Sequence, residues 1–255
     1  MTEAKAAAPT PGLTIAPWPD VDHSAFGPIQ SKPITRIQKV VGAMLSRNWV
    51  MIPHVTHNDD ADISGLDDAG KRLSERSGIK VTPLAYMIKA AVHGLKAYPR
   101  FNASLDSAGA HLILKQYFHI GFAVDTPNGL VVPVIRDADR KTLTEIAAEV
   151  AEVSTLARTK GLPMDRMSGG CFSISSLGSI GGTSFTPIIN APEVAIMGTT
   201  RSVLKPVSVD GELVWRTMLP LSLSYDHRVI NGADAARFCI AFAEALSQPD
   251  ALGLS

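Results

Sequence analysis

Residues 221–233 have the sequence LSLSYDHRVINGA, in which a strand pattern changes abruptly into a turn and a helix pattern. Leucine or tyrosine alternates with serine up to Tyr225, which is the pattern of a β-strand with two different faces. The alternation stops at Asp226-His227, and Gly232 allows a tight reversal before a final helix, which we expect near 233–247. The stretch therefore predicts a strand that ends in a turn bearing a histidine.

Outward from this stretch, turn signals separate further strands and amphipathic helices. Asp210-Gly211 predicts a turn between strands at about 193–208 and 212–225, and residues 126–129 (TPNG) predict one between strands at 111–124 and 130–136. Further strands are expected at 53–63 and 171–176. Helices are expected from residue 33, with an apolar stripe at 34, 37, 41, 45 and 49, over 65–77, from Thr82-Pro83, and from a capping box at 142–145 that Gly161 ends. This order predicts an α/β fold of the α+β two-layer type, with a mixed sheet and helices packed on one face.

The composition excludes several classes of function. The 255 residues hold 24 Lys and Arg against 24 Asp and Glu, so the chain lacks the basic field that drives non-specific nucleic-acid binding. No apolar stretch is long enough to cross a bilayer, and residues 1–13 have no apolar signal-peptide core. Cys171 and Cys239 form no disulfide framework, which indicates buried thiols in a reducing compartment. We expect no nucleic-acid or membrane partner, and a location in the cytoplasm of a bacterium or the mitochondrial matrix of a eukaryote.

The first 30 residues differ in composition from the rest. Alanine, proline and threonine dominate up to Pro19, and apolar periodicity is absent, which is typical of an extended linker. We expect a linker over residues 1–30 and one folded domain over residues 31–255. An N-terminal linker also indicates that the chain is a fragment or the last module of a larger protein.

Two groups of residues are candidates for chemistry. A histidine at a strand end, as His227 is predicted to be, is either a fixed general base that works near neutral pH or a turn residue with no chemical role. Residues 169–178 (GGCFSISSLG) place Ser173 and Ser175 on one side of a strand and Ser176 on the other. Without a G-x-S-x-G elbow, this stretch is either a donor of hydrogen bonds to an oxyanion or a serine-rich strand followed by a glycine turn.

No metal site is expected from the sequence. His54 and His57 are three positions apart, and on a strand their side chains would point to opposite faces. Neither cysteine belongs to a cluster with metal-ligand spacing.

The stretch around His227 is similar to that of a known family. Residues 226–233 resemble the H-x-x-x-D-G active-site motif of the dihydrolipoamide acyltransferases, which form the cores of the 2-oxo acid dehydrogenase complexes. The segments 36–39, 47–49, 52–56, 101–103, 128–133 and 190–194 are also similar, so the resemblance covers roughly residues 28–247. Residues 48–57 (NWVMIPHVTH) most resemble the acetyl-specific, pyruvate-type branch.

The resemblance implies a fold, an assembly and an activity. It implies a chloramphenicol-acetyltransferase-like domain over residues 31–255, in an obligate trimer whose active sites are channels between subunits. Acetyl would pass between a dihydrolipoyl arm and coenzyme A, as in the core of a pyruvate dehydrogenase complex. His227 would take the thiol proton, and Ser175 would bond the tetrahedral oxyanion. Coenzyme A is then a substrate, and the partners are a lipoyl domain outside this sequence and the other subunits of the complex.

Two positions depart from the family pattern. Asn231 stands where the motif usually has an aspartate that braces the active site; asparagine keeps a neutral hydrogen bond and loses only the ion pair. Residues 247–250 (SQPD) interrupt the last helix and leave Leu252 and Leu254 as the large apolar residues beyond it. We therefore expect an active trimer and a weak or absent larger cage.

Two other functions stay open on the sequence. A catalytically weak structural scaffold of such a complex agrees with Asn231 and with the lack of lipoyl and peripheral-subunit-binding modules, whereas the presence of His227 and Ser175 favours an enzyme. The third function is an acetyltransferase that acts on a small hydroxylated molecule. The resemblance outside the histidine motif disfavours this third function.

Overall fold

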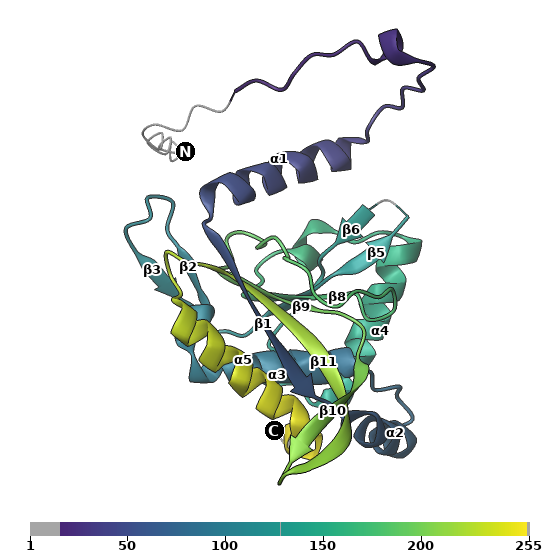
Figure 1. The fold of residues 1–255 in the computed structure, drawn as a ribbon, viewed down its shortest axis with the longest axis vertical. Helices are drawn as coiled ribbons and strands as arrows, with labels where there is room; N and C mark the ends of the chain where they lie inside the picture. Colours follow the sequence, from purple (N-terminus) through teal and green to yellow (C-terminus); the bar gives the residue numbers. More distant parts are fainter. Residues whose placement is uncertain (1–15, 128, 254–255) are drawn as a thin grey trace.

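The computed structural model describes residues 16–127 and 129–253 (Figure 1). The strands in these ranges are β1 (His54–Asp62), β2 (Ala103–Leu105), β3 (Leu112–Leu114), β4 (Ile120–Phe122), β5 (Val124–Thr126), β6 (Gly129–Val131), β7 (Val134–Ile135), β8 (Phe172–Ser176), β9 (Ala195–Thr199), β10 (Val203–Val209) and β11 (Glu212–Asp226). The α-helices are α1 (Arg36–Met51), α2 (Leu66–Ser77), α3 (Pro83–Ala97), α4 (Leu143–Thr159), α5 (Gly232–Ser247) and α6 (Pro249–Gly253). Three short 3-10 helices are η1 (His23–Phe26), η2 (Pro99–Phe101) and η3 (Met164–Met167).

A mixed sheet forms the centre of the domain, as the sequence predicted. Within the described residues it has seven strands in the order β1-β11-β9-β8-β4-β7, with β10 paired to β11. Strand β8 runs parallel to β4 and β9, and the other neighbours are antiparallel. The pairs β2–β3 and β5–β6 are separate hairpins. The predicted turn at 126–129 joins β5 to β6; Asn128 itself lies outside the described residues.

Strand β11 shows how the alternating sequence makes two faces. Leu219, Leu221 and Leu223 are buried on the face that packs against the helices, which removes their apolar surface from water. Ser222 is buried on the opposite face, where its hydroxyl donates a hydrogen bond of 2.8 Å to Oδ1 of Asn58 on β1. A polar residue is therefore tolerated inside because a neighbouring strand supplies an acceptor.

Helices α3, α4 and α5 contribute to the same buried cluster as that face of the sheet, which confirms the two-layer prediction. The predicted capping box is present at α4, where Thr142 and Glu145 each accept the other's backbone N–H. Helices α3 and α5 approach closely, because a Cβ at Gly94 would lie 2.8 Å from the ring of Phe238. The glycine therefore sets the spacing between the two helices.

Helix α1 is the exception to this layer, because it stands clear of the sheet (Figure 1). The sequence correctly predicted the helix and its apolar stripe. Val41, Leu45 and Trp49 of that stripe are 38%, 40% and 56% exposed. At the end of the helix, the buried Asn48 donates a hydrogen bond of 3.0 Å to the Ile189 carbonyl. Helix α1 is thus anchored at one end, while an apolar face has no cover within the described residues.

Three predicted strands were too long. The segment 130–136 is divided between β6 and β7, with residues 132–133 in neither strand. The segment 111–124 is divided among β3, β4 and the start of β5, because residues 115–119 pass from the β2–β3 hairpin to the main sheet. The segment 193–208 is interrupted at residues 200–202. The partner strand has Pro220 opposite this gap, and proline has no N–H to continue the ladder with β9. Pairing with β11 resumes at Val203 and Met218.

The two ends of the chain differ in how far they are folded. Residues 16–30 are exposed and contain only η1, whereas residues 1–15 lie outside the described residues, so the linker stays a prediction. The last long helix ends at Ser247 as predicted, and α6 follows. Leu252 on α6 is 6% exposed and packs against the core of its own chain; Leu254 lies outside the described residues.

In the described part of the chain, no helix combines the length and the apolar character needed to span a membrane.

Candidate active site

His227 is the first residue after β11, and its imidazole is exposed. Its backbone N–H donates a hydrogen bond of 3.1 Å to the Pro53 carbonyl, which attaches the turn to the start of β1. The Tyr225 ring lies 5.8 Å away, centroid to centroid. Neither imidazole nitrogen has a hydrogen-bond partner among the described residues. The ring is therefore positioned by the backbone, and both nitrogens are free to exchange a proton.

An ion pair that sequence reasoning missed fixes the turn around His227. Asp226 is only 2% exposed, and its carboxylate accepts hydrogen bonds from the Arg228 guanidinium at 2.9 and 2.6 Å. The backbone N–H of Arg228 donates to the same carboxylate at 3.0 Å. The Asp226 carboxylate raises the pKa of the Arg228 side chain through these hydrogen bonds. The sequence signal for this ion pair was the aspartate two positions before the arginine. The pair holds the backbone on both sides of His227.

Ser175 lies on β8, half-buried, on the face opposite the helices. In the ladder it is paired with Gly198 of β9, and Gly198 is paired with Ser222 of β11. The register confirms that Ser173 shares this face. No hydrogen bond satisfies Oγ of Ser175 within residues 16–127 and 129–253. This hydroxyl is therefore free to donate to a ligand.

Asn231 is the N-cap of α5. Its Oδ1 accepts the backbone N–H of Asp234 at 2.9 Å, and its Nδ2 donates to the Asp234 carboxylate at 2.9 Å. That carboxylate also pairs with the Arg237 guanidinium at 3.0 Å. In the structure, Asn231 thus fixes the start of the helix after the His227 turn.

The sheet keeps Ser175 and His227 apart within one chain. Two strand spacings separate β8 from β11, about 10 Å, and the five residues from Ser222 to His227 add about 16 Å. The two Cα atoms are therefore about 19 Å apart, too far for one reacting atom to lie within about 3 Å of both side chains. A single chain does not combine the two groups.

His54, the other histidine close to this end of the sheet, has both ring nitrogens in hydrogen bonds. Its Nδ1 lies 2.8 Å from the Ile52 carbonyl, and its Nε2 accepts the Ile189 backbone N–H at 3.0 Å. These two bonds require the tautomer with the proton on Nδ1. His54 and His57 lie on opposite faces of β1, as the strand pattern predicted. Within the described residues, no three His, Cys, Asp or Glu side chains gather closely enough to hold a metal ion.

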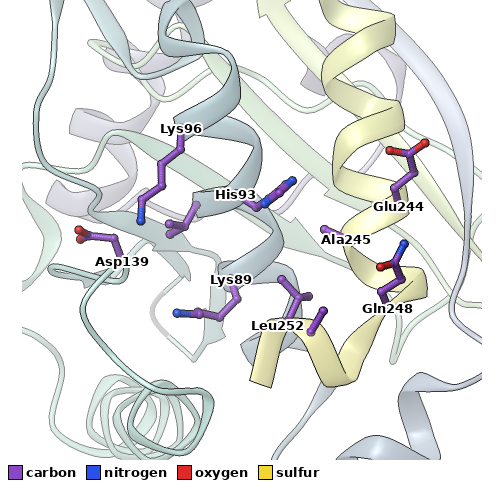
Figure 2. Close-up of a pocket in the computed structure, with 10 residues that line it drawn as sticks. Lys89, His93, Lys96, Asp139, Glu244, Ala245, Gln248 and Leu252 are labelled. Carbon is purple, nitrogen blue, oxygen red and sulfur yellow. The ribbon is translucent and has the colours of Figure 1, made fainter. Parts of the chain in front are cut away.

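A cavity of about 390 Å³ lies elsewhere, between α3, α5, α6 and the loop after β7 (Figure 2). Lys89 and Lys96 extend from α3 toward Asp139, whereas His93 extends toward α5, the helix that carries Glu244. Lys89 is buried and donates a hydrogen bond of 3.1 Å to the Lys141 carbonyl. Neither His227 nor Ser175 lines this cavity.

The sequence matches, over residues 27–254, the family described as 2-oxoacid dehydrogenases acyltransferase (catalytic domain). The chain belongs to this acyltransferase family. It is 59% identical over 238 residues to the dihydrolipoyllysine-residue acetyltransferase component of the pyruvate dehydrogenase complex of Cupriavidus necator, covering 92% of this chain and 43% of that protein. The component of the same name from Pseudomonas aeruginosa is 52% identical over 241 residues, covering 93% of this chain and 44% of that protein. The chain thus spans less than half the length of these curated relatives.

Solved structures agree with the family assignment. One is a structure of Azotobacter vinelandii dihydrolipoamide acetyltransferase from an investigation of the roles of a serine, a histidine and an asparagine in its catalytic mechanism. Its TM-score is 0.89 at 50% identity, and the match covers 93% of this chain and 99% of that one. The cubic core of a pyruvate dehydrogenase multienzyme complex matches with the same TM-score, identity and coverage. A chloramphenicol acetyltransferase matches with a TM-score of 0.51 at 13% identity, covering 80% of this chain and 94% of that one, which shows the shared fold. The acyltransferase fold expected from the sequence is confirmed.

Proposed function

We propose that the chain transfers an acetyl group between a dihydrolipoyl group and coenzyme A, as the core domain of a pyruvate dehydrogenase complex. Family membership supports acyl transfer, and the names of the relatives at 59% and 52% identity support this acyl group and this complex. The lipoyl domain and the other subunits of the complex are the partners in this proposal.

The separation of Ser175 and His227 is the observation that carries the proposal. Each has a free polar group, yet about 19 Å divides their Cα atoms in one chain. An active site that uses both must combine Ser175 of one chain with His227 of another. The serine, histidine and asparagine studied in the A. vinelandii enzyme are separated by the same numbers of residues as Ser175, His227 and Asn231. This agreement supports a catalytic role for the three positions.

A homotrimer is the assembly that we propose for sharing these residues. Pairing the Ser175 surface of one chain with the His227 surface of the next is a head-to-tail contact, which must close into a ring to stay finite. The exposed apolar side chains of α1 support association, because exposed apolar patches often mark an interface. The relative that forms a cubic core supports a multimeric core in general.

The chemistry then follows from the two side chains. The His227 imidazole takes the proton of the attacking thiol, and the resulting thiolate attacks the carbonyl carbon of the acetyl thioester. Negative charge develops on the carbonyl oxygen, where the neighbouring chain's Ser175 hydroxyl donates a hydrogen bond. Collapse of this intermediate breaks the original C–S bond, and the leaving thiolate takes the proton back from the imidazolium. Asn231 contributes by capping α5 beyond the histidine turn.

Acetyl transfer from acetyl-CoA to free dihydrolipoamide tests this function. His227→Ala should lower turnover by about 10²–10⁴-fold. Ser175→Ala should lower kcat by about 10²–10³-fold with little change in KM. Ser176→Ala is the matched control, because this neighbouring hydroxyl is exposed on the other side of β8 and should leave turnover unchanged. A fully active His227→Ala variant would refute the mechanism, and an inactive wild-type protein would favour the scaffold function.

A further inference from the structure

The loop between β8 and β9 crosses the face of the sheet that carries Ser175. Early in this loop, Phe185 lies against Gly198, because a Cβ at Gly198 would be 2.6 Å from the phenyl ring. Gly198 is the ladder partner of Ser175, so the ring lies on the strand next to the serine. Later in the loop, Ile189 is buried in a second, smaller apolar cluster. The loop therefore covers part of the face on which the serine is presented.

Two side chains hold both polar backbone groups of Ile189. The His54 imidazole, at the start of β1, accepts the Ile189 N–H at Nε2 over 3.0 Å. The buried Asn48 amide, near the end of α1, donates to the Ile189 carbonyl over 3.0 Å. The His54 ring is itself fixed, since its Nδ1 donates to the Ile52 carbonyl at 2.8 Å and the Trp49 ring lies 5.3 Å away, centroid to centroid. His54 and Asn48 together form a clamp on the loop.

The clamp is also attached to the turn that carries His227. The carbonyl of Pro53, the residue before His54, accepts the His227 backbone N–H at 3.1 Å. At the end of the clamped loop, the Val194 carbonyl accepts the Asp226 backbone N–H at 2.8 Å. A shift of the loop or of the start of β1 would therefore be passed directly to the histidine turn.

One form of the His54 ring makes both of its hydrogen bonds. The proton must be on Nδ1, and Nε2 must be free to accept, so the ring is neutral. Without this acceptor the Ile189 N–H would be buried and unsatisfied, which folded proteins avoid, so the loop would shift until the group found another partner.

Building on the proposed function, we propose that His54 is a positioning residue for acyl transfer. Together with Asn48 it fixes the β8–β9 loop over the face that bears Ser175, and through this loop and the Pro53 carbonyl it fixes the turn that bears His227. The imidazole of His54 contacts no reacting atom in this proposal. The serine and the histidine that one chain gives to two different interfaces therefore depend on the same clamp.

Steady-state kinetics of the whole protein test this role, with acetyl-CoA and dihydrolipoamide as substrates. His54→Leu removes both ring hydrogen bonds, so kcat should fall by about 10- to 100-fold, as for a small misplacement of catalytic groups, with a much smaller change in KM. His54→Gln should recover part of kcat, because its side-chain oxygen can replace Nε2 as the acceptor.

His57→Gln is the matched control for these variants. His57 lies on the same strand but on its opposite face, and its side chain has no hydrogen-bond partner among the described residues. This variant should keep the wild-type kcat. A His54→Leu variant that also keeps the wild-type kcat would overturn the inference.

Asn48→Asp tests the other half of the clamp. The variant keeps the shape of the side chain and the oxygen that accepts from the Arg47 guanidinium, but it cannot donate to the Ile189 carbonyl. Its kcat should also fall. Combined with His54→Leu, the loss should be smaller than the product of the two separate losses, because both side chains act through Ile189. Losses that multiply as for independent sites would overturn the clamp.

Hydrogen–deuterium exchange separates this inference from the acetyltransferase function, because it needs no turnover. In His54→Leu, peptides that cover residues 188–191 and 226–228 should exchange several-fold faster than in wild type, whereas a peptide within α4 should be unchanged. Unchanged exchange in either of the first two peptides would overturn the positioning role. If the wild-type protein is inactive while both peptides respond, the proposed function is overturned and the link between His54 and the histidine turn is supported.

Discussion

Active sites shared between chains predict that two inactive variants restore each other. Ser175→Ala retains His227, and His227→Ala retains Ser175. If the two side chains act across an interface, a mixed ring contains some interfaces in which one variant supplies the serine and the other supplies the histidine. If they acted within one chain, every site in a mixed ring would still lack one of them.

The expected recovery follows from counting interfaces. An intact interface needs Ser175 from the His227→Ala chain and His227 from the Ser175→Ala chain. With equal amounts of the two variants and random assembly, each of these conditions is met half of the time. About a quarter of all interfaces then hold an intact pair. In trimers these interfaces fall only in rings that contain both variants, each with one intact interface of three, so such rings should have about a third of the wild-type activity. The separation of about 19 Å within one chain predicts that there is no competing route inside a single chain.

The assay is acetyl transfer by co-expressed chains that carry two different affinity tags, purified over both resins. The two variants purified separately and then mixed without unfolding are the control, since assembled rings exchange no chains during a short assay. Recovery to about a third after co-expression and purification over both resins, with none in the control, supports the shared site. If rings shown to contain both tags recover no activity, the active site is not shared between chains.

Three further predictions concern stability and assembly. Burial raises the pKa of Glu193 in the folded chain to about 7, so between pH 4.5 and pH 7 this group ionises mainly in the unfolded chain. At a fixed chain concentration, the unfolding free energy of wild type should therefore fall by about 3 kcal/mol relative to that of Glu193→Gln over this range. Denaturant titrations that give the same pH dependence of the unfolding free energy for both proteins would contradict this. Gly94→Ala should destabilise by about 1–3 kcal/mol, because its Cβ would meet the Phe238 ring at 2.8 Å. Gly42→Ala, where no atom lies within 4 Å, should be neutral or stabilising by up to about 1 kcal/mol, and equal melting temperatures for the two variants would count against the close-approach argument. Light scattering at micromolar concentration should give a mass near three chains, and a monomer would contradict the shared site. Leu252 is already buried in its own chain, so we expect no stable assembly of trimers through the C-terminal tail. A stable particle of many trimers would contradict this expectation.

Features that depend on neighbouring residues could be predicted from the amino-acid sequence. Alternation along 221–225 is sufficient to predict a strand, since successive side chains of a strand point to opposite faces. The capping box of Thr142 and Glu145 predicted the start of α4, because both partners lie within one turn. The DHRVING pattern at 226–232 also pointed to His227 without any structure, because the motif is contiguous in the chain.

Features that depend on strand order and register became visible in the folded chain and not before. The sequence suggested that His227 and Ser175 belong to one site, but the ladder β11-β9-β8 shows that a single chain holds them at separate places. The gap at residues 200–202 follows from Pro220, twenty residues downstream, so no local pattern around the gap could reveal it. Glu193 was seen only as part of a family segment. Its burial against Gly170, and the bond from Val194 to the histidine turn, arise from contacts between parts of the chain that are distant in sequence, where local propensity carries no information.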